Sequence, residues 1–524
     1  MNAVAQQPSF TAAAEAGLWL RKTLNAGADL HLSSLDVAQG DGFLAMPGQT
    51  VDGRRFIADA IERGAAAVLA QHESTQTPAQ IEPASVAQAT LAELTRHCGD
   101  VAAAFYGDPS EALEIIAVTG TNGKTSCANW IASGGATDAT STAAIGTLGV
   151  RQYQGGDLSV SPVAQVPALT TPDAVSLQRV LAALVRAGTT SVAIEASSIG
   201  LDQHRLGGVK VDAAIFTNLS RDHLDYHGSD QAYAQAKALL FARPELKVAI
   251  VNGDDPAAEQ MLAETAPGVQ TIAYGFTPAR HGSAARQKVT IAAIEPGESH
   301  DVLHLAGDLG ETSVAVELTG RFNALNAAAV WATWRALGVS EVDSSQRLTK
   351  LVPVPGRMQA IRVDGAPLAI VDYAHTPDAL QSVLSALTDQ AKTRGGKLWC
   401  VFGCGGDRDN GKRPLMAAAA EAVADELVLT SDNPRGESAE QILNQMLAGL
   451  KEAPRAVITD RAGAIEAAVS QAGLNDIVLV AGKGHEATQE IAGVKHPFLD
   501  EAVALAALQR RALHGQGFAE AAGV

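Results

Sequence analysis

The sequence predicts an α/β protein of three domains, and two observations lead to this prediction. The chain has 524 residues, more than one hydrophobic core supports, which gives about three domains of typical size. Short apolar runs alternate with helical segments from about residue 112 to 352, and the alternation restarts at about residue 353. This alternation is typical of parallel sheets covered by helices. We therefore expect domains at 1–111, 112–352 and 353–524.

The first predicted domain has short apolar patches that are broken by glycine and proline, for example at 42–53. Gly107-Asp108-Pro109-Ser110 is typical of a loop and marks the connection to the second domain. We expect a small α/β unit in this part of the chain.

A glycine-rich turn, Gly120-Thr121-Asn122-Gly123-Lys124-Thr125, opens the second domain between the apolar residues 113–117 and a helical segment at 126–132. Such a turn directs backbone N–H groups and a helix N-terminus at one spot, while its lysine adds a cation and its threonine hydroxyl can bind Mg²⁺. It predicts a polyphosphate site. Val118 stands where the full P-loop pattern has glycine, so the match is to a shortened form. The alternative is a glycine turn with a surface lysine.

Further strands are predicted in the second domain at 192–194, 213–216 and 248–251, with an amphipathic helix at 177–185. Polar residues follow each strand, and open α/β sheets bind ligands at the carboxyl ends of their strands. The sequence therefore predicts a central P-loop ATPase-like parallel sheet with helices, whose nucleotide site lies at these strand ends.

The third domain is predicted to hold strands at 368–371, 398–402, 427–430 and 477–480. A polar cluster follows each strand, so four polar loops should meet at one edge of a Rossmann-like sheet. We expect a second ligand site there, although the pattern alone does not identify the ligand.

Composition limits the partners of this protein. The formal net charge of −18 argues against binding to nucleic acid or to an anionic membrane surface, because the global field would repel both. The four cysteines form no C-x-x-C pair, which indicates reduced thiols and no zinc site. The N-terminus has no basic region before its apolar residues, and no run of 18 apolar residues occurs. We expect a cytoplasmic protein without a membrane span.

Six motifs occur in order along nearly the whole chain: Gly120-Thr121-Asn122-Gly123-Lys124-Thr125, Glu195-Ala196-Ser197-Ser198, Asn218-Leu219-Ser220-Arg221-Asp222-His223-Leu224-Asp225, Gly320-Arg321-Phe322-Asn323-Ala324-Leu325-Asn326, Pro355-Gly356-Arg357-Met358 and Asp372-Tyr373-Ala374-His375-Thr376-Pro377. Together they resemble the Mur ligases, the ATP-dependent amide-forming enzymes of cell-wall (peptidoglycan) precursor synthesis, on which cell shape and division depend. Several independent motifs in the same order exclude a chance match.

The resemblance implies that a substrate carboxylate attacks the γ-phosphate of ATP, and that an amine then opens the acyl phosphate to an amide. Cations must neutralise the transferred phosphoryl group. The resemblance implies ATP as co-substrate and Mg²⁺ as cofactor. The implied catalytic residues are Lys124, Glu195, His223 and Lys237. The implied metal ligands are Thr125, Glu195, His223 and Lys237, the last as a carbamate.

The residue types alone leave simpler interpretations open for three of these residues. Glu195 would be an exposed carboxylate at a strand end, His223 a hydrogen-bonded loop histidine, and Lys237 a solvated helical lysine. A carbamate requires a neutral amine, and hence a partly desolvated lysine.

The resemblance also implies a set of ATP contacts in the second and third domains. Among them, Asp372 would bind the ribose hydroxyls. Instead of binding ATP, Asn326 could be a helix-start residue and Arg357 a charge in a linker; these are the alternatives. The implied ATP-binding residues are Gly120, Thr121, Asn122, Gly123, Lys124, Thr125, Ser126, Asn326, Arg357, Asp372 and His375.

Contacts to a uridine-nucleotide muramoyl-dipeptide are implied in the first and second domains. A hydroxyl pair and an arginine suit a carboxylate-bearing sugar peptide. The implied residues are Leu32, Ser34, Gln49, Thr50, Val51, Thr170, Thr171, Ser197, Gln203 and Arg205.

The third domain resembles those family members that add meso-diaminopimelate. This amino acid differs from lysine by one distal carboxylate, so a selective pocket needs a cation where that carboxylate lands, and Arg435 supplies a bidentate guanidinium. A simple β-turn with proline is the alternative for the tetrapeptide 432–435. The implied amino-acid-binding residues are Arg408, Asp432, Asn433, Pro434, Arg435, Gly482 and Glu486.

The chain departs from the family pattern at Ile199, Leu169 and Leu35-Asp36, which affects details of the uridine and muramoyl contacts. A lysine-adding ligase, a folylpolyglutamate synthetase-like ligase and an ATP-gated scaffold without turnover are the alternative functions. We expect a monomer whose third domain closes over the second, since the acyl phosphate must be shielded from water.

Overall fold

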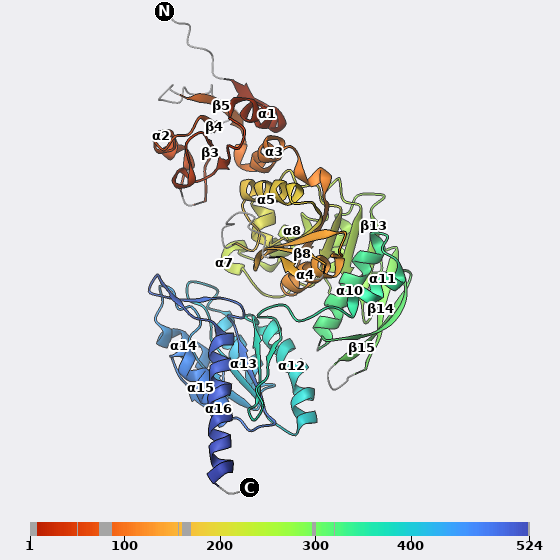
Figure 1. Ribbon diagram of the computed structural model, residues 1–524, viewed down its shortest axis with the longest axis vertical. Coiled ribbons are helices and arrows are strands. Elements are labelled where there is room, and N and C mark those ends of the chain that lie inside the picture. The colour runs from red at the N-terminus through yellow and green to blue at the C-terminus, as the bar shows by residue number, and fades with distance from the viewer. Residues whose placement is uncertain are drawn as a thin grey trace, which may run out of the picture.

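The computed structural model describes residues 8–49, 51–72, 86–155, 157–159, 169–295, 300–318 and 320–521. Three sheets follow one another along the long axis of the molecule, each with its own helices (Figure 1). We call the sheets, with their helices and adjoining loops, the first unit (8–108), the second unit (109–352) and the third unit (353–521). The α/β class predicted from the sequence is confirmed.

The first unit is a parallel sheet in the order β1-β5-β4-β3-β2. Its core forms where α1 and α3 pack on the sheet through Leu20, Leu69 and Val101. Its strands are β1 Ser9–Phe10, β2 Leu30–His31, β3 Gly42–Ala45, β4 Ala67–His72 and β5 Ala87–Ala92, and its helices are α1 Ala13–Thr23, η1 Ser34–Asp36, η2 Gly53–Phe56, α2 Ile57–Glu62 and α3 Leu94–Tyr106.

A close backbone contact joins the first unit to the second. A Cβ atom added to Gly99 of α3 would lie 2.2 Å from the carbonyl oxygen of Gly207, and one added to Gly208 would lie 2.6 Å from the carbonyl oxygen of Gly99. No side chain other than hydrogen fits at these positions, so the two units meet backbone to backbone.

The second unit is an eleven-stranded sheet in the order β16-β15-β14-β13-β12-β11-β6-β10-β7-β8-β9. The run from β14 to β7 is parallel, as predicted, and it contains the expected strands as β6 Glu114–Thr119, β10 Thr189–Glu195, β11 Ala213–Phe216 and β12 Val248–Asn252. The remaining strands are β7 Ser141–Gly146, β8 Gly149–Gln154, β9 Asp157–Ser159, β13 Gln270–Gly275, β14 Gln287–Glu295, β15 Asp301–Gly307 and β16 Gly310–Val316.

Antiparallel strands extend both ends of this sheet, which the sequence prediction missed. β8 and β9 continue from β7, while β15 and β16 continue from β14. Burial of β15 and β16 is incomplete and uneven along each strand. Strands with one solvated face lack the continuous apolar run by which the parallel strands were recognised.

Helices cover both faces of the second sheet. Ile116 and Val118 of β6 pack with α4 and α10, whereas Ile115 and Ala117 pack with α5. The helices are η3 Pro109–Ala112, α4 Lys124–Gly135, α5 Ala174–Arg186, α6 Ser198–Asp202, α7 Leu224–His227, α8 Asp230–Ala238, α9 Ala258–Ala263, α10 Arg321–Ala336 and α11 Glu341–Leu348. Both helices predicted around this sheet, at 126–132 and 177–185, are therefore confirmed.

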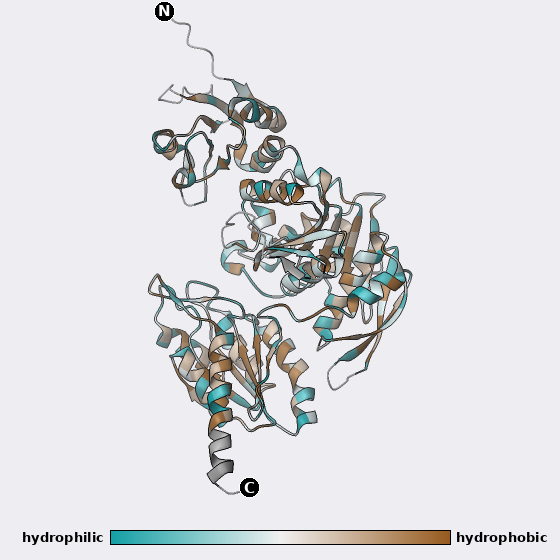
Figure 2. Cartoon of the chain, viewed as in Figure 1, coloured by the Kyte–Doolittle hydropathy of each residue, from teal (hydrophilic) through white to brown (hydrophobic). Residues whose placement is uncertain are grey.

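The third unit is a sheet in the order β17-β18-β22-β19-β20-β21, in which only β17 runs antiparallel to its neighbour. Figure 2 shows hydrophobic residues along its strands and helices of mixed hydropathy around them. Its strands are β17 Gln359–Ile361, β18 Leu368–Asp372, β19 Leu398–Phe402, β20 Glu426–Leu429, β21 Ala456–Val457 and β22 Ile477–Ala481, with a separate hairpin of β23 Thr488–Ile491 and β24 Val494–Pro497; its helices are α12 Pro377–Arg394, α13 Lys412–Glu421, α14 Ala439–Leu447, α15 Arg461–Gln471 and α16 Asp500–Ala521. The four strands predicted here are confirmed.

A buried ion pair fixes α16 to the third sheet. Arg461 donates from Nε and Nη2 to the Asp500 carboxylate at 2.7 Å each, and Nη2 also donates to the carbonyl oxygen of Ala481 at the end of β22. Both side chains are fully buried.

All four cysteines are buried and free. In the part of the chain that the structure describes, each helix is too short or too polar to cross a membrane.

Candidate functional site

The glycine-rich turn lies between the end of β6 and the start of α4, as predicted. Gly120 and Gly123 have positive φ angles of 144° and 87°, and Cβ atoms there would lie 1.9 Å from Thr217 Oγ1 and 2.5 Å from Asn326 Oδ1. The turn therefore requires glycine at both positions for its backbone angles and for its close neighbours.

Lys124 is the first residue of α4, and its ammonium group folds back over the turn. Its Nζ donates to the carbonyl oxygens of Gly120 and Thr121 at 2.7 and 2.8 Å. Burial lowers the pKa of Lys124, and the charges of Glu195 and Asp222 oppose that shift. Lys124 is thus hydrogen-bonded to the turn, which argues against the alternative of a free surface lysine.

A cavity of about 370 Å³ lies beside the turn and reaches the third unit. It brings together many of the predicted ATP-binding residues, whereas Gly120, Thr121, Lys124 and His375 are not part of its lining. The predicted residues that line it are Asn122, Gly123, Thr125, Ser126, Asn326, Arg357 and Asp372.

Two of these residues come from the third unit and are held in place by hydrogen bonds. Arg357 donates from Nη2 to Thr125 Oγ1 at 3.0 Å, and its guanidinium lies 4.3 Å from the centre of the Tyr373 ring. The Asp372 carboxylate accepts from the backbone N–H groups of Met358 and Ala374 at 2.7 Å each. Burial raises the pKa of Asp372, although the charge of Arg357 opposes this.

Glu195 ends β10 and is 1 % exposed, so it is not the exposed carboxylate of the alternative interpretation. Its Oε2 accepts from the hydroxyls of Thr125 at 2.9 Å and Thr147 at 3.1 Å, and its Oε1 accepts from the backbone N–H of Thr147 at 2.9 Å. The carboxylate is thus fixed next to the hydroxyl at the start of α4.

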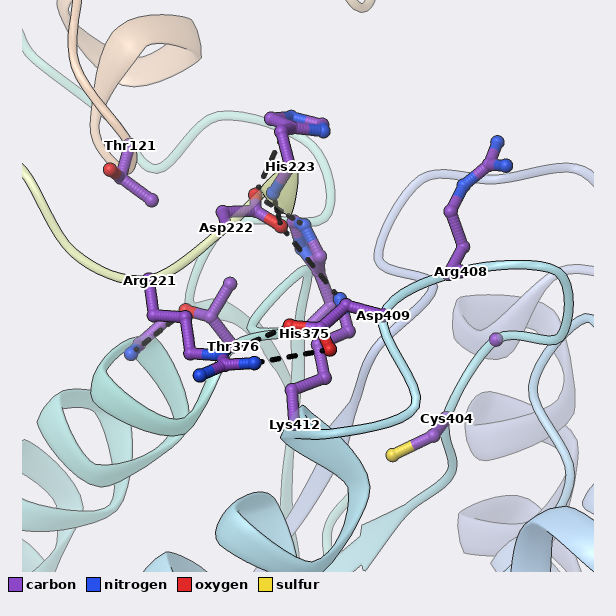
Figure 3. A network of polar contacts seen from close by, with 12 residues as sticks. Thr121, Arg221, Asp222, His223, His375, Thr376, Cys404, Arg408, Asp409 and Lys412 are labelled. Carbon is purple, nitrogen blue, oxygen red and sulfur yellow. Dashed lines mark hydrogen bonds and ion pairs between the residues drawn. The ribbon is translucent and has the colours of Figure 1, made fainter. Parts of the chain in front are cut away.

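Asp222 gathers positively charged or ionisable groups from two units (Figure 3). Its carboxylate lies 3.5 Å from His223 Nε2, 3.6 Å from His375 Nε2 and 3.9 Å from Lys412 Nζ. Burial favours the neutral acid, yet the hydrogen bond from His375 and the charges of His375, His223 and Lys412 outweigh it and hold the pKa of Asp222 far below its usual range.

His223 itself has a left-handed backbone with φ of 52°. Burial, together with the charges of Lys124 and His375, lowers its pKa to about 4 against the opposing effect of Asp222. The imidazole is therefore neutral at neutral pH and has a lone pair available.

Lys237 of α8 is 1 % exposed, which contradicts the alternative of a solvated helical lysine. Its Nζ donates to the carbonyl oxygen of Gly120 at 3.0 Å and lies 4.0 Å from the centre of the Tyr233 ring. Burial and the charge of Lys124 hold the pKa of Lys237 well below its usual value. This is the environment that a neutral amine needs.

In the described residues, no cluster of three or more His, Cys, Asp or Glu side chains is arranged to hold a metal. Mg²⁺ in nucleotide sites usually takes one or two protein oxygens and completes its shell with phosphate and water. Thr125 and Glu195, with oxygens 2.9 Å apart, provide a donor pair of that kind.

The predicted muramoyl contacts of the second unit lie close together. Thr171 Oγ1 lies 2.9 Å from Ser197 Oγ, Arg205 Nη1 donates to the Thr171 carbonyl oxygen at 2.8 Å, and Arg205 Nη2 donates to Gln203 Oε1 at 2.7 Å. Thr170 receives a hydrogen bond from Thr147 at 3.3 Å. The cluster therefore extends to the neighbourhood of Glu195.

Gln49 of the first unit reaches this cluster through Tyr226, which sequence reasoning missed. The Tyr226 hydroxyl accepts from Gln49 at 2.9 Å and from Gln203 at 3.2 Å. Elsewhere in the first unit, Leu32 packs against the core and Val51 is exposed, while Ser34 is buried and bonds to Asp59. Thr50 lies outside the described residues.

The residues predicted to bind the amino acid form one compact hydrogen-bonded group, and two arginines lie apart from it. Lys483 Nζ donates to Asn433 Oδ1 at 3.2 Å and to Glu486 Oε2 at 2.9 Å, and Asn433 Nδ2 donates to Glu486 Oε2 at 2.8 Å. A Cβ atom on Gly482 would lie 2.7 Å from Asp432 Oδ2. Burial raises the pKa of Asp432, although Arg461 and Lys483 oppose it.

Arg435 and Arg408 lie apart from the 370 Å³ cavity. Arg435 follows the buried Pro434, has a left-handed φ of 52°, and donates from Nη1 to the carbonyl oxygen of Gly406 at 2.8 Å. Arg408 is exposed, and it donates to the carbonyl oxygen of Asp407 at 2.9 Å. Arg435 is next to the loop that carries Arg408, but neither side chain lines the cavity with the glycine turn.

His485 is a second residue that sequence reasoning missed, although it lies in the polar cluster after β22. It forms a hydrogen bond with the backbone of Thr147, and its Nδ1 is buried with no hydrogen-bond partner among the described residues. Burial and the charge of Arg357 lower its pKa to about 4, whereas Glu486 opposes this. His485 therefore links the third unit to the residue that holds Glu195.

Three family models match this chain. The Mur ligase family catalytic domain matches residues 30–106, the Mur ligase middle domain matches 118–334, and the Mur ligase glutamate ligase domain matches 356–484.

Curated relatives match over nearly the full length. A protein from Janthinobacterium sp. named UDP-N-acetylmuramoyl-L-alanyl-D-glutamate–2,6-diaminopimelate ligase is 44% identical over 93% of this chain and 95% of its own. A protein of the same name from Acidovorax sp. is 44% identical over 96% of this chain and 98% of its own.

Solved structures agree with this match. A UDP-N-acetylmuramoyl-L-alanyl-D-glutamate–2,6-diaminopimelate ligase aligns with a TM-score of 0.61 at 36% identity, covering 92% of this chain and 95% of that chain. A folylpolyglutamate synthase from Mycobacterium tuberculosis aligns with a TM-score of 0.59 at 20% identity, covering 74% of this chain and 92% of that chain. The second likeness shows the fold alone.

Proposed function

This chain belongs to the Mur ligase family, and on that premise we propose that it is an ATP-dependent ligase that adds meso-diaminopimelate to UDP-N-acetylmuramoyl-L-alanyl-D-glutamate. The observation that carries the proposal is the near full-length identity of 44% to relatives named for this reaction. The reaction forms a C–N bond at the expense of ATP and belongs to peptidoglycan precursor synthesis.

The site supports a reaction in two steps. The substrate carboxylate attacks the γ-phosphate of ATP, which forms an acyl phosphate and releases ADP. The amine of the incoming amino acid then displaces phosphate from the acyl carbon, loses a proton and forms the amide. The first step brings two anions together, so preorganised positive groups must stabilise the transferred phosphoryl group. Lys124 and the N-terminus of α4 meet that need on the nucleotide side.

Mg²⁺ is part of this proposal, with Thr125 and Glu195 as its first candidate ligands. When bound, it supplies positive charge to the phosphates. His223 and a carbamate on Lys237 are further candidate ligands. A buried lysine with a depressed pKa has the neutral amine that carbamate formation requires. Addition of that amine to CO₂, with loss of a proton, would give an anionic oxygen donor.

The proposal distributes the three substrates over the domains expected from the sequence. The first domain (1–111) would bind the uridine nucleotide, the second (112–352) ATP and the muramoyl-dipeptide part of the same precursor, and the third (353–524) the amino acid. Arg435 and Arg408 would bind carboxylates of diaminopimelate, while Gly482, Glu486 and the Asp432–Arg435 loop would hold its distal end. We also propose that the protein acts as a cytoplasmic monomer, without a nucleic-acid partner.

Phosphate release from ATP in the presence of UDP-N-acetylmuramoyl-L-alanyl-D-glutamate tests the proposal. Release is expected to be fast with meso-diaminopimelate, slow with lysine and near background without an amino acid. Lys124→Ala should abolish release, because it removes the cation that faces the phosphates. A lysine-adding ligase would release phosphate faster with lysine than with meso-diaminopimelate. An ATP-gated scaffold would release no phosphate under any of the three conditions. Full activity of Lys124→Ala contradicts the role of the glycine turn.

A further inference from the structure

Two adjacent residues of the second unit, one basic and one acidic, form ion pairs with an acidic and a basic residue of the third unit. Arg221 donates from Nε and Nη2 to the Asp409 carboxylate at 3.0 and 3.3 Å, and the Asp222 carboxylate lies 3.9 Å from Lys412 Nζ (Figure 3). Arg221 and Asp222 belong to the loop after β11, whereas Asp409 and Lys412 flank the start of α13. We call the pair Arg221–Asp409 the clasp.

The acidic partner of the clasp is anchored. The Asp409 side chain is 12% exposed and the Arg221 side chain 42% exposed, and Asp409 Oδ1 also accepts from the backbone N–H of Gly411 at 2.9 Å. The neighbouring Lys412 side chain is 10% exposed. An anchored carboxylate in a partly desolvated place binds a guanidinium more strongly than a freely rotating one does, because less side-chain entropy is lost.

The clasp holds one side of a loop whose other side is fixed within the third unit. Arg413 is fully buried, donates to both oxygens of Glu437 at 2.8 Å, and donates to the carbonyl oxygen of Gly405 at 3.0 Å. Arg408 lies in the chain between Gly405, which Arg413 holds, and Asp409, to which it is adjacent. A shift of Asp409 therefore moves Arg408.

All ion pairs between the second and third units, within the described residues, converge on Arg221 and Asp222. The proposed reaction places the acyl phosphate on the second unit and the amino acid on the third. Its rate then depends on how the two units are set against each other, since a displacement of about 1 Å can cost about 10²-fold.

We propose that Arg221 and Asp409 are positioning residues that set the Arg408 loop, and with it the incoming amino acid, against the phosphoryl site. This inference rests on the proposed function. The two residues act through each other and through Arg408, and they take no part in formation of the acyl phosphate.

The test is a double-mutant cycle with Arg221→Gln, Asp409→Asn and the double variant. Each single variant should lower kcat/KM for meso-diaminopimelate by about 10- to 100-fold, while KM for ATP changes less than twofold. The double variant should lose no more than the larger single loss, because residues that act as one pair are not additive. The acyl phosphate is measured separately by trapping it as a hydroxamate with hydroxylamine, and its yield should equal that of the wild type in all three variants.

Lys397→Gln and Glu426→Gln supply the matched control, since they remove an exposed ion pair of 2.8 Å within the third unit and should leave all constants unchanged. The proposal is overturned if the single variants behave like the wild type, if their losses multiply in the double variant, or if hydroxamate formation falls in parallel with amide formation. A wild-type protein that forms neither hydroxamate nor amide overturns the proposed function itself. A fully active wild type with unaffected variants overturns the clasp alone.

Discussion

At the residue scale, residues of the third unit contact the residues that hold Glu195 beside the glycine turn. Glu195 accepts from Thr125 and Thr147, and Thr147 in turn contacts His485 of the third unit. Arg357 of the third unit bonds to Thr125. Two residues of the third unit thus touch the two residues that orient Glu195, which ties the geometry of this carboxylate to the position of the third unit.

The guanidinium of Arg435 should decide between diaminopimelate and lysine. Arg435→Ala is expected to lower the ratio of kcat/KM for meso-diaminopimelate to kcat/KM for lysine. The loss corresponds to about 2–5 kcal/mol of transition-state stabilisation, because the distal carboxylate loses its charged partner. The ratio of the two specificity constants measures this effect. Arg455→Ala removes an exposed arginine from the same unit and should leave the ratio unchanged. An unchanged ratio in Arg435→Ala refutes the assignment of the pocket.

The imidazole of His485 should make stability depend on pH below neutrality. Its pKa is about 4 in the folded chain and about 6.5 when unfolded, so the unfolded chain binds the extra proton between these values. Stability is therefore lost as pH falls from 6.5 toward 4, and the effect is absent above 6.5. His485→Gln should show a smaller drop in thermal midpoint between pH 7 and pH 5 than the wild type. His496→Gln, at an exposed position, should keep the wild-type drop; equal drops in all three proteins would contradict the prediction.

At the scale of elements, the strand-then-polar-loop pattern explains how much of the site could be read from the sequence. Each predicted parallel strand ends in polar residues at the carboxyl edge of its sheet, which placed Glu195, Asn433 and Glu486 at such edges, whereas the roles proposed for them came from the family resemblance. Tyr226 gave no such signal, because its partners Gln49 and Gln203 come from distant segments. Contacts between units depend on tertiary packing, and local periodicity carries no information about them.

The buried pair between α15 and α16 should contribute strongly to stability. Asp500→Ala leaves the guanidinium of Arg461 buried without its counter-ion and is expected to cost about 3–5 kcal/mol in free energy of unfolding. Glu466→Ala breaks a second pair between the same two helices, Glu466–Arg510, whose side chains are 50% and 52% exposed, and should cost at most about 1 kcal/mol. Urea titration followed by intrinsic fluorescence compares the two variants. Equal losses would show that burial does not set the strength of these pairs.

At the scale of the whole molecule, the two junctions between units are built differently. The first and second units meet through the backbones of Gly99, Gly207 and Gly208, beside side-chain contacts such as Gln49–Tyr226. The second and third units meet through side chains, chiefly the clasp and the bond from Arg357 to Thr125. Side-chain contacts can adjust as two units rotate against each other, so domain closure is expected at the second junction.

The first junction should tolerate no added methyl group. Gly99→Ala is expected to cost about 1–3 kcal/mol in stability and to weaken binding of the uridine-nucleotide peptide, because its Cβ overlaps a backbone carbonyl and forces the units apart. Gly135→Ala adds a methyl group to another helix, where the nearest atom is Thr142 Cγ2 at 3.4 Å, and should be near neutral. Calorimetric titration with the nucleotide peptide and thermal unfolding measure the two effects. Wild-type binding by Gly99→Ala would contradict the prediction.

The glycine junction has a consequence for the choice of precursor. Because backbone lies directly on backbone there, we expect the distance between the proposed uridine site and the glycine turn to be fixed. A precursor whose peptide is one residue shorter or longer should then place its carboxylate before or beyond the turn. We therefore expect precursors to be distinguished by their length.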